Sequence, residues 1–135
     1  MLSLTTKSRY GLPAVLELAK NYGSSPLHVK DIAAKHNISP QYLEQLLNRL
    51  IRIGLVQAVR GQKGGCVLGR PPSEITLMEI LEALEGRLGL AQSLPWDEVI
   101  FGYASQAEAA IRSELKISLS EVLAKHEART VMFHI

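Results

Sequence analysis

The 135-residue sequence is poor in the residues that small proteins use for cross-linking and metal binding. Its single cysteine, Cys66, excludes an internal disulfide and leaves too few thiolates for a zinc or iron–sulfur site held by one chain. No stretch approaches the roughly 20 consecutive apolar residues that span a bilayer, and residues 1–11 lack a secretory signal, so we expect a cytoplasmic protein. Hydrophobic residues still make up 47% of the chain, which predicts one globular domain with its own core rather than disorder.

Acidic residues are scarce in the first half of the chain. Residues 1–70 contain ten Lys and Arg against three Asp and Glu, whereas residues 71–135 contain five against ten, so the halves carry net charges of +7 and −5. This asymmetry favours a polyanion as the partner of the first half and self-association or a protein partner for the second. An accidental asymmetry is the alternative.

Two helices are predicted before residue 37. Apolar spacing indicates a helix over residues 6–22, in which Pro13 either causes a kink or marks the start of the regular part. A shorter helix over residues 29–36 follows, with Ile32 and Ala33 facing inward.

A third helix is predicted to begin at Ser39 and Pro40 and to end at Gly54, because these residues favour the N-cap, the first helical position and a left-handed C-terminal cap. One face of this helix is apolar and the opposite face is polar. The apolar positions are Leu43, Leu46, Leu47 and Leu50, and the polar ones are Gln41, Glu44, Gln45 and Asn48.

Two short β-prone runs, residues 55–59 and 66–68, bracket a glycine-rich cationic turn. The resulting order of helix, helix, turn, helix and hairpin is that of a winged helix-turn-helix, whose third helix enters the DNA major groove. We therefore expect a mainly α fold with a small β wing. Residues 1–70 would form the DNA-binding region and residues 71–135 a linker helix, a dimerisation helix and a tail, within one compact domain.

Capping signals organise the acidic half. Thr76 with Glu79 predicts a helix that Gly86 ends, and Ser118 with Glu121 predicts another. Between them, a long helix is predicted to begin at Pro95, with Asp97 and Glu98 in its first turn. Its apolar stripe is too long for so short a chain to cover alone, so we expect a homodimer related by a two-fold axis. The stripe comprises Ile100, Ala104, Ala107, Ile111 and Leu115.

The third helix and the turn between the strands supply the candidate DNA contacts. Glutamine can bind adenine and glutamate the cytosine amino group, and Arg60 and Lys63 would meet phosphates or the minor groove. The alternatives are a solvated helix face and a glycine turn that is basic by chance. The turn matches no nucleotide-binding glycine loop.

No catalytic constellation stands out, so an enzyme is not expected. Cys66 is more easily explained as a small buried residue than as a redox switch. Residues 131–135 are unusually apolar, and they either pack on the protein or form a docking peptide that enters a partner's pocket. The peptide would be formed by Met132, Phe133, His134 and Ile135.

Seven short segments resemble the BadM/Rrf-type winged-helix transcriptional regulators along nearly the whole chain. They are KSRYGL at residues 7–12, ISPQYLEQL at 38–46, GLV at 54–56, VRG at 59–61, GG at 64–65 leading to Leu68, ITL at 75–77 and LEG at 84–86. The resemblance implies a homodimer crossed through the long helix and bound to a pseudo-palindromic operator. The candidate DNA-binding residues are then Ser39, Gln41, Tyr42, Glu44, Gln45, Arg60, Gln62 and Lys63.

Many members of this family hold an iron–sulfur cluster on three cysteines after the helix that ends at Gly86. Here that stretch reads RLGLAQSL, without cysteine or histidine, so no cofactor is expected. Cys66 also replaces the aromatic residue usual in the family's wing.

The cysteine-free loop and the chain's last residues resemble a branch of the family that represses cysteine-metabolism genes with the enzyme O-acetylserine sulfhydrylase as partner. The alternatives are another signal, through Cys66 oxidation or a small ligand near Trp96, and a protein-interaction module that binds no DNA.

Overall fold

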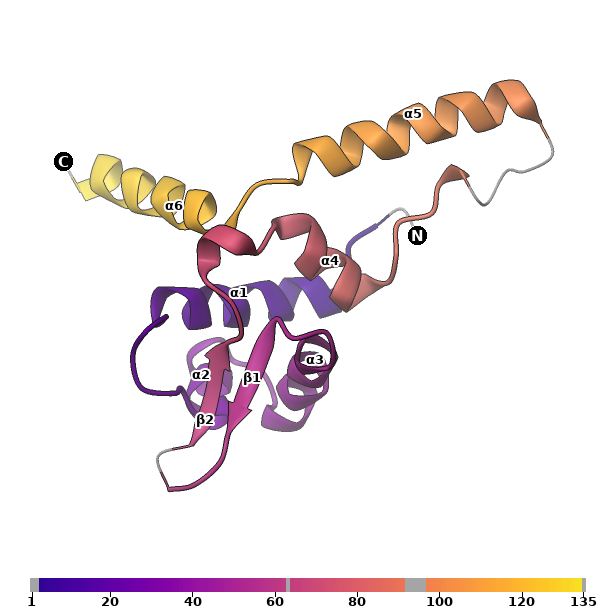
Figure 1. Cartoon of the computed structure of the whole chain (residues 1–135). Helices are drawn as coiled ribbons and strands as arrows, with labels where there is room; N and C mark the ends of the chain where they lie inside the picture. The colour runs from indigo at the N-terminus through magenta and orange to yellow at the C-terminus, as the bar shows by residue number, and fades with distance from the viewer. Residues whose placement is uncertain (1–2, 63, 92–96, 135) are drawn as a thin grey trace.

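The computed structural model describes residues 3–62, 64–91 and 97–134, with the side chains of residues 131–134 left out. Within these residues, six α-helices, the short 3-10 helix η1 and a two-stranded antiparallel sheet form a winged helix with a C-terminal extension (Figure 1), so the predicted fold class is confirmed. The elements are α1 (Thr6–Lys20), α2 (Val29–Lys35), α3 (Pro40–Arg52), β1 (Val56–Val59), β2 (Gly65–Leu68), η1 (Pro72–Glu74), α4 (Leu77–Glu85), α5 (Glu98–Glu114) and α6 (Leu119–His134). No helix in the described ranges is long and apolar enough to cross a membrane.

Helix α1 begins well before its proline. The side chain of Thr5 accepts a hydrogen bond from the Lys7 N–H and caps the helix, and Pro13 lies inside it. The alternative that the regular part starts at Pro13 is therefore wrong. The rest of the helix compensates for the donor that proline lacks by packing, since Ala14, Val15 and other residues after Pro13 are buried.

The core is formed mainly by α1, α3 and α4. The four leucines predicted for the inner face of α3 are each at most 2% exposed, and each buried leucine contributes about 1.5–3 kcal/mol. Helix α4 adds Ile80 and Leu84, both fully buried. Gly11 lets α1 approach α4 closely, because a Cβ there would lie 2.7 Å from Cδ1 of Leu84.

The wing is a hairpin held against the segment before α2. Strands β1 and β2 pair from Val56 with Leu68 to Val59 with Gly65. Cys66 exchanges backbone hydrogen bonds of 2.8 and 3.0 Å with Leu27, which adds a one-residue bridge to the hairpin. Gly65 is required at this crossing, since its φ is +149° and a Cβ would lie 2.3 Å from the Leu27 carbonyl oxygen.

The capping predictions for the acidic half are confirmed for α4 and corrected for α5. Thr76 and Glu79 form a reciprocal capping box, and Gly86 ends α4 with a φ of +101°. Helix α5 begins at Glu98, and Asp97 caps it through hydrogen bonds from the N–H groups of Val99 and Ile100. Asp97 therefore precedes the helix instead of lying in its first turn, so the predicted start at Pro95 is wrong; Pro95 itself lies outside the described residues.

Helices α5 and α6 extend from the winged-helix body on the side opposite the wing tip (Figure 1). No residue of α5 is buried. Helix α6 starts where Ser118 accepts a hydrogen bond from the Glu121 N–H, and its first residue, Leu119, is 1% exposed. The fold thus combines a winged-helix body with a long helix, α5, whose surface is uncovered.

Candidate nucleic-acid interface

The outer face of α3 is polar and exposed, as predicted. Ser39 caps the helix by accepting a 3.1 Å hydrogen bond from the Tyr42 N–H. The exposed side chains include Gln41, Glu44, Gln45 and Asn48. Arg52 is also exposed and continues the stripe at i+11 from Gln41, so its helical spacing from Gln41 is the sequence signal that identifies it.

Tyr42 differs from the other predicted contacts of α3 because it is only half-exposed. Its hydroxyl lies 3.1 Å from Oγ1 of Thr6, and its ring meets that of Tyr10 edge-on with centroids 6.2 Å apart. Such a tyrosine pair adds about 0.5–1.5 kcal/mol beyond burial. Through these two contacts, Tyr42 packs the start of α3 against the start of α1.

The wing lies beside the polar face of α3. One open hollow is lined by Glu44 and Asn48 from the helix and by Ala58 and Val59 from β1, so the two elements share a surface. Arg60 and Gln62 are exposed at the wing tip, where the Gly64 N–H donates to the Gly61 carbonyl over 3.0 Å. Lys63, the remaining predicted contact, lies outside the described residues.

The basic residues of the first half fall into two groups. Some already interact with a carboxylate or carbonyl of the protein, and the others, here called available cations, have no acidic partner among the described residues. Lys35 is 2.8 Å from a carboxylate oxygen of Glu17, Arg70 pairs with Glu79, and Arg49 donates to the Leu84 carbonyl. Burial raises the pKa of Glu17, but the hydrogen bond and charge of Lys35, together with the charge of Lys20, lower it overall. In the parts of the chain that the structure describes, five exposed or half-exposed cations of this half have no acidic partner. They are Lys7, Lys30, Arg52, Arg60 and Arg9, whose guanidinium also lies 5.7 Å from the centre of the Tyr10 ring.

Several of these available cations lie near the polar face of α3 and the wing. Lys7 is in the first turn of α1, which contacts Tyr42 through Thr6, and Arg52 and Arg60 belong to α3 and the wing. Unpaired cations flanking a polar helix face are suited to phosphate contacts. Lys7 and Lys30 were not singled out from the sequence, because a charge count does not reveal which cations are already paired.

Cys66 is buried behind the wing. Its side chain is 5% exposed, and burial together with the charge of Glu44 raises the pKa of the thiol. A protonated, enclosed thiol is a poor nucleophile and reacts slowly with oxidants. This environment supports the reading of Cys66 as a small core residue.

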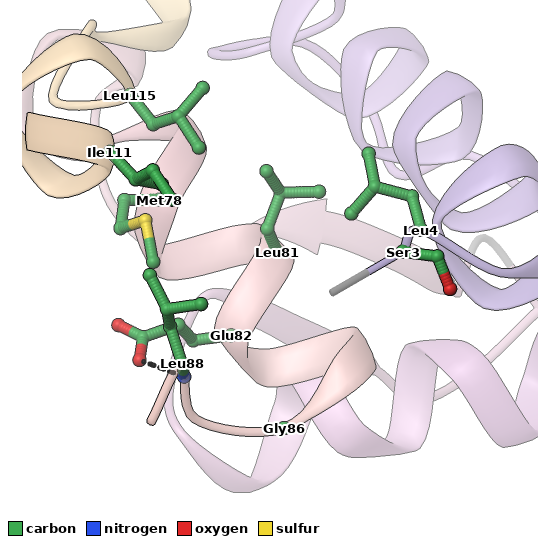
Figure 2. A pocket seen from close by; sticks show the side chains of 9 residues that line it. All are labelled: Ser3, Leu4, Met78, Leu81, Glu82, Gly86, Leu88, Ile111 and Leu115. Atoms are coloured by element: carbon green, nitrogen blue, oxygen red, sulfur yellow. Dashed lines mark hydrogen bonds between the residues drawn. The ribbon is translucent and has the colours of Figure 1, made fainter. Parts of the chain in front are cut away.

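The residues that directly follow α4 are held by a hydrogen-bonded network. Arg112 of α5 makes a bidentate pair with Glu82 of α4 at 2.8 and 3.0 Å and also donates to the Leu88 carbonyl. Glu82 accepts from the Leu88 N–H in turn, and its pKa is lowered chiefly by Arg112. Beside this network, an apolar cavity of about 150 Å³ lies between α4, Leu4 and α5 (Figure 2).

The stretch RLGLAQSL after α4 contains no cysteine or histidine that could bind an iron–sulfur cluster, and the described residues contain no group of three or more His, Cys, Asp or Glu able to hold a metal ion. The polar groups around Glu82 are instead paired with Arg112 and Leu88.

The predicted docking tail is only partly described. Helix α6 continues to His134, so the backbone of Met132, Phe133 and His134 is helical. The side chains of these residues, and all of Ile135, lie outside the described part. Trp96, near which a small ligand was considered, also lies outside it.

Comparison with known proteins places the chain in a family. Residues 4–130 match the family model Rrf2, described as an iron-dependent transcriptional regulator. The chain belongs to the Rrf2 family of transcriptional regulators. This confirms the resemblance, and the relatives are DNA-binding transcriptional regulators rather than enzymes, as expected.

Individual relatives agree with this assignment. The chain is 43% identical over 97 residues to the transcriptional regulator CymR of Bacillus subtilis, covering 72% of this chain and 70% of that one. It is also similar to the solved structure of CymR, the global cysteine regulator of B. subtilis, with a TM-score of 0.81, 37% identity and coverage of 93% and 98%. A second solved structure, IscR of T. potens, matches with a TM-score of 0.78 and 35% identity over 95% of this chain and 90% of that one.

Proposed function

We propose that this Rrf2-family regulator is a homodimeric repressor that binds an operator with α3 in the major groove and the wing over the DNA backbone. The observation that carries the proposal is the shared surface of α3 and the wing, where an exposed polar helix face adjoins Arg60. The polar side chains can bind base edges, and the five available cations can neutralise phosphates. Ser39 and Tyr42 would hold the start of the helix in place.

The proposed homodimer rests on α5. Five large hydrophobic side chains of this helix are at least 36% exposed: Val99, Ile100, Phe101, Tyr103 and Ile111. Ile100 and Ile111 lie on one face, and the other three extend the apolar surface around the start of the helix. Uncovered apolar surface along a helix of this length marks an interface, and a two-fold dimer would pair the face of Ile100 and Ile111 with itself. Two recognition helices would then meet half-sites about one helical turn, or a multiple, apart.

The experiment is a selection of duplexes from a randomised pool with the purified full chain, followed by affinity measurements on the enriched duplex. Arg60→Ala is expected to weaken binding by about tenfold or more, because a groove or phosphate contact contributes about 1–3 kcal/mol. Arg87→Ala is the matched control, since Arg87 is an exposed arginine just after α4 and lies outside the proposed interface. Failure to enrich any duplex, or equal loss in both variants, would contradict the proposal.

We further propose that the regulated genes serve cysteine metabolism and that O-acetylserine sulfhydrylase modulates binding. The similarity to a protein described as the global cysteine regulator of B. subtilis supports the first point, and the apolar sequence of residues 131–135 supports the second. Calorimetric titration of the chain into this enzyme should give binding that is lost when Ile135 is removed. Absence of binding by either form would contradict the partner and leave the DNA-binding proposal intact.

The proposal includes no iron–sulfur cofactor, in contrast to the iron dependence in the family description. The absence of cysteine and histidine from residues 87–94 supports this difference. A same-family regulator that answers to another signal remains the second candidate, and it becomes the better account if the enzyme does not bind.

A further inference from the structure

Glu85, the last residue of α4, gathers four hydrogen bonds from the start of α1. Its Oε2 accepts from the Thr5 N–H at 2.7 Å and from the Ser8 N–H and hydroxyl at 3.3 and 2.6 Å, and its Oε1 accepts from the Thr5 hydroxyl at 2.7 Å. Ser8 is only 1% exposed, so its polar atoms depend on this partner. One carboxylate thus joins segments about 80 residues apart in the sequence.

This carboxylate supplies a charge that α1 lacks. The first turn of α1 contains no acidic residue and carries Lys7, whose charge is unfavourable at the positive end of the helix dipole. Although burial raises the pKa of Glu85, the hydrogen bonds from Ser8 and Thr5 lower it to about 2. Glu85 is therefore ionised at neutral pH and anchors the start of α1 from another helix.

The turn of α1 that Glu85 holds also contacts α3, the proposed recognition helix. Thr6 lies between the Glu85 partners Thr5 and Ser8, and its Oγ1 is 3.1 Å from the hydroxyl of Tyr42. The other end of this connection is also fixed, because Arg49 of α3 donates to the carbonyl of Leu84, next to Glu85. The end of α4 therefore touches α3 directly and through α1.

We propose that Glu85 is a positioning residue for DNA recognition, which sets the placement of α3 through Thr6 and Tyr42 without contacting DNA itself. The proposal rests on the operator-binding function proposed above. A displaced recognition helix would lose base contacts that depend on geometry and keep phosphate contacts that tolerate displacement. Glu85 should therefore affect selectivity among DNA sequences more than overall DNA affinity.

The test compares full-length variants on two duplexes: the one enriched by the unmodified chain and a scrambled duplex of the same composition. Glu85→Gln should lower the ratio of the two affinities by about five- to tenfold, the effect of losing about 1 kcal/mol of geometry-dependent contact. Affinity for the scrambled duplex should change by less than about twofold, since non-specific binding rests on phosphate contacts. Thr6→Val, which removes the hydroxyl that meets Tyr42 and nearly keeps the shape, should lower the ratio in the same way.

Glu79→Gln is the matched control. Glu79 is a carboxylate of the same helix with a structural role, and its hydrogen bonds and ion pair are made with Thr76 and Arg70 rather than with α1. We expect it to reduce thermal stability and to leave the affinity ratio unchanged. The double variant of Glu85→Gln and Thr6→Val should be no worse than the poorer single variant.

Two results would overturn the inference while leaving operator binding standing. One is an unchanged ratio for Glu85→Gln, and the other is an equal loss for Glu79→Gln, which would reveal general destabilisation. If the unmodified chain enriches no duplex, the proposed function fails, and the inference fails with it.

Discussion

The structural role of several single residues in this protein depends on how closely their neighbours approach. Gly11 and Gly102 are both helical glycines, yet a Cβ on Gly11 would lie 2.7 Å from buried Leu84, and one on Gly102 would meet nothing within 4 Å. A sequence shows both as helix-weakening residues and cannot tell them apart. The same holds for Cys66, whose burial and bridge to Leu27 depend on how the wing folds back.

Gly11→Ala and Gly102→Ala should change stability in opposite directions. The first forces a methyl group against the packed Leu84 and should lower the free energy of unfolding by about 1–3 kcal/mol. The second improves helix propensity in open space and should raise it by about 0.5–1 kcal/mol. Urea unfolding measures both, and a stabilising Gly11→Ala would contradict the close packing of α1 on α4.

Cys66 should react slowly with a thiol reagent in the folded protein. Its thiol is buried and its pKa is raised, so both access and the thiolate fraction are low at neutral pH. The rate should rise strongly in denaturant, which serves as the internal control. Rapid labelling of the native protein would contradict this environment and favour the alternative in which Cys66 oxidation is the signal.

At the scale of elements, sequence patterns predict what is local. The leucine spacing of α3, the Ser39 cap and the Thr76–Glu79 capping box are each contained within a few residues, and the structure agrees with all three. The start of α5 was misplaced because Pro95 and Asp97 both signal helix starts and only the backbone decides between them. The links of Glu85 to Ser8 and of Arg112 to Glu82 join distant segments, and no local pattern reveals them.

Acid should weaken the link between α4 and α1. Because the pKa of Glu85 is about 2 in the folded protein against an ordinary 4.5, its stabilising contribution is fully present above pH 4.5 and is lost as the pH falls toward 2. Glu85→Gln lacks this contribution at every pH. The difference in unfolding free energy between the two proteins should therefore be larger at pH 7 than at pH 2.5, and a constant difference would show that the carboxylate charge plays no part.

At the scale of the whole molecule, the charge asymmetry and the uncovered α5 support the proposal of a DNA-binding body, formed by α1 to α4 and the wing, and a self-associating extension. The sequence predicted this division from its +7 and −5 halves, but it could not show which cations are paired. The structure shows that several basic residues are committed to Glu17, Glu79 and the Leu84 carbonyl. The available charge is therefore smaller than the count and lies largely around α1, α3 and the wing.

Placing an acidic residue on the apolar face of α5 should separate the proposed dimer. Ile100 is 41% exposed and belongs to the predicted stripe, whereas Ala109 lies on the opposite side of the helix, nine residues further along. In sedimentation velocity, Ile100→Asp is expected to shift the protein to monomer and Ala109→Asp to leave it dimeric. A protein that is monomeric without substitution would contradict the homodimer.

The winged-helix body is proposed to bind DNA through its available cations and the polar face of α3. The affinity of the full chain for its enriched duplex, measured as a function of salt, is the direct test of this binding. Each neutralised phosphate releases counterions, so with several contacts per protomer we expect affinity to fall by about a hundredfold or more between roughly 50 and 200 mM salt. Binding that does not change with salt would contradict the account.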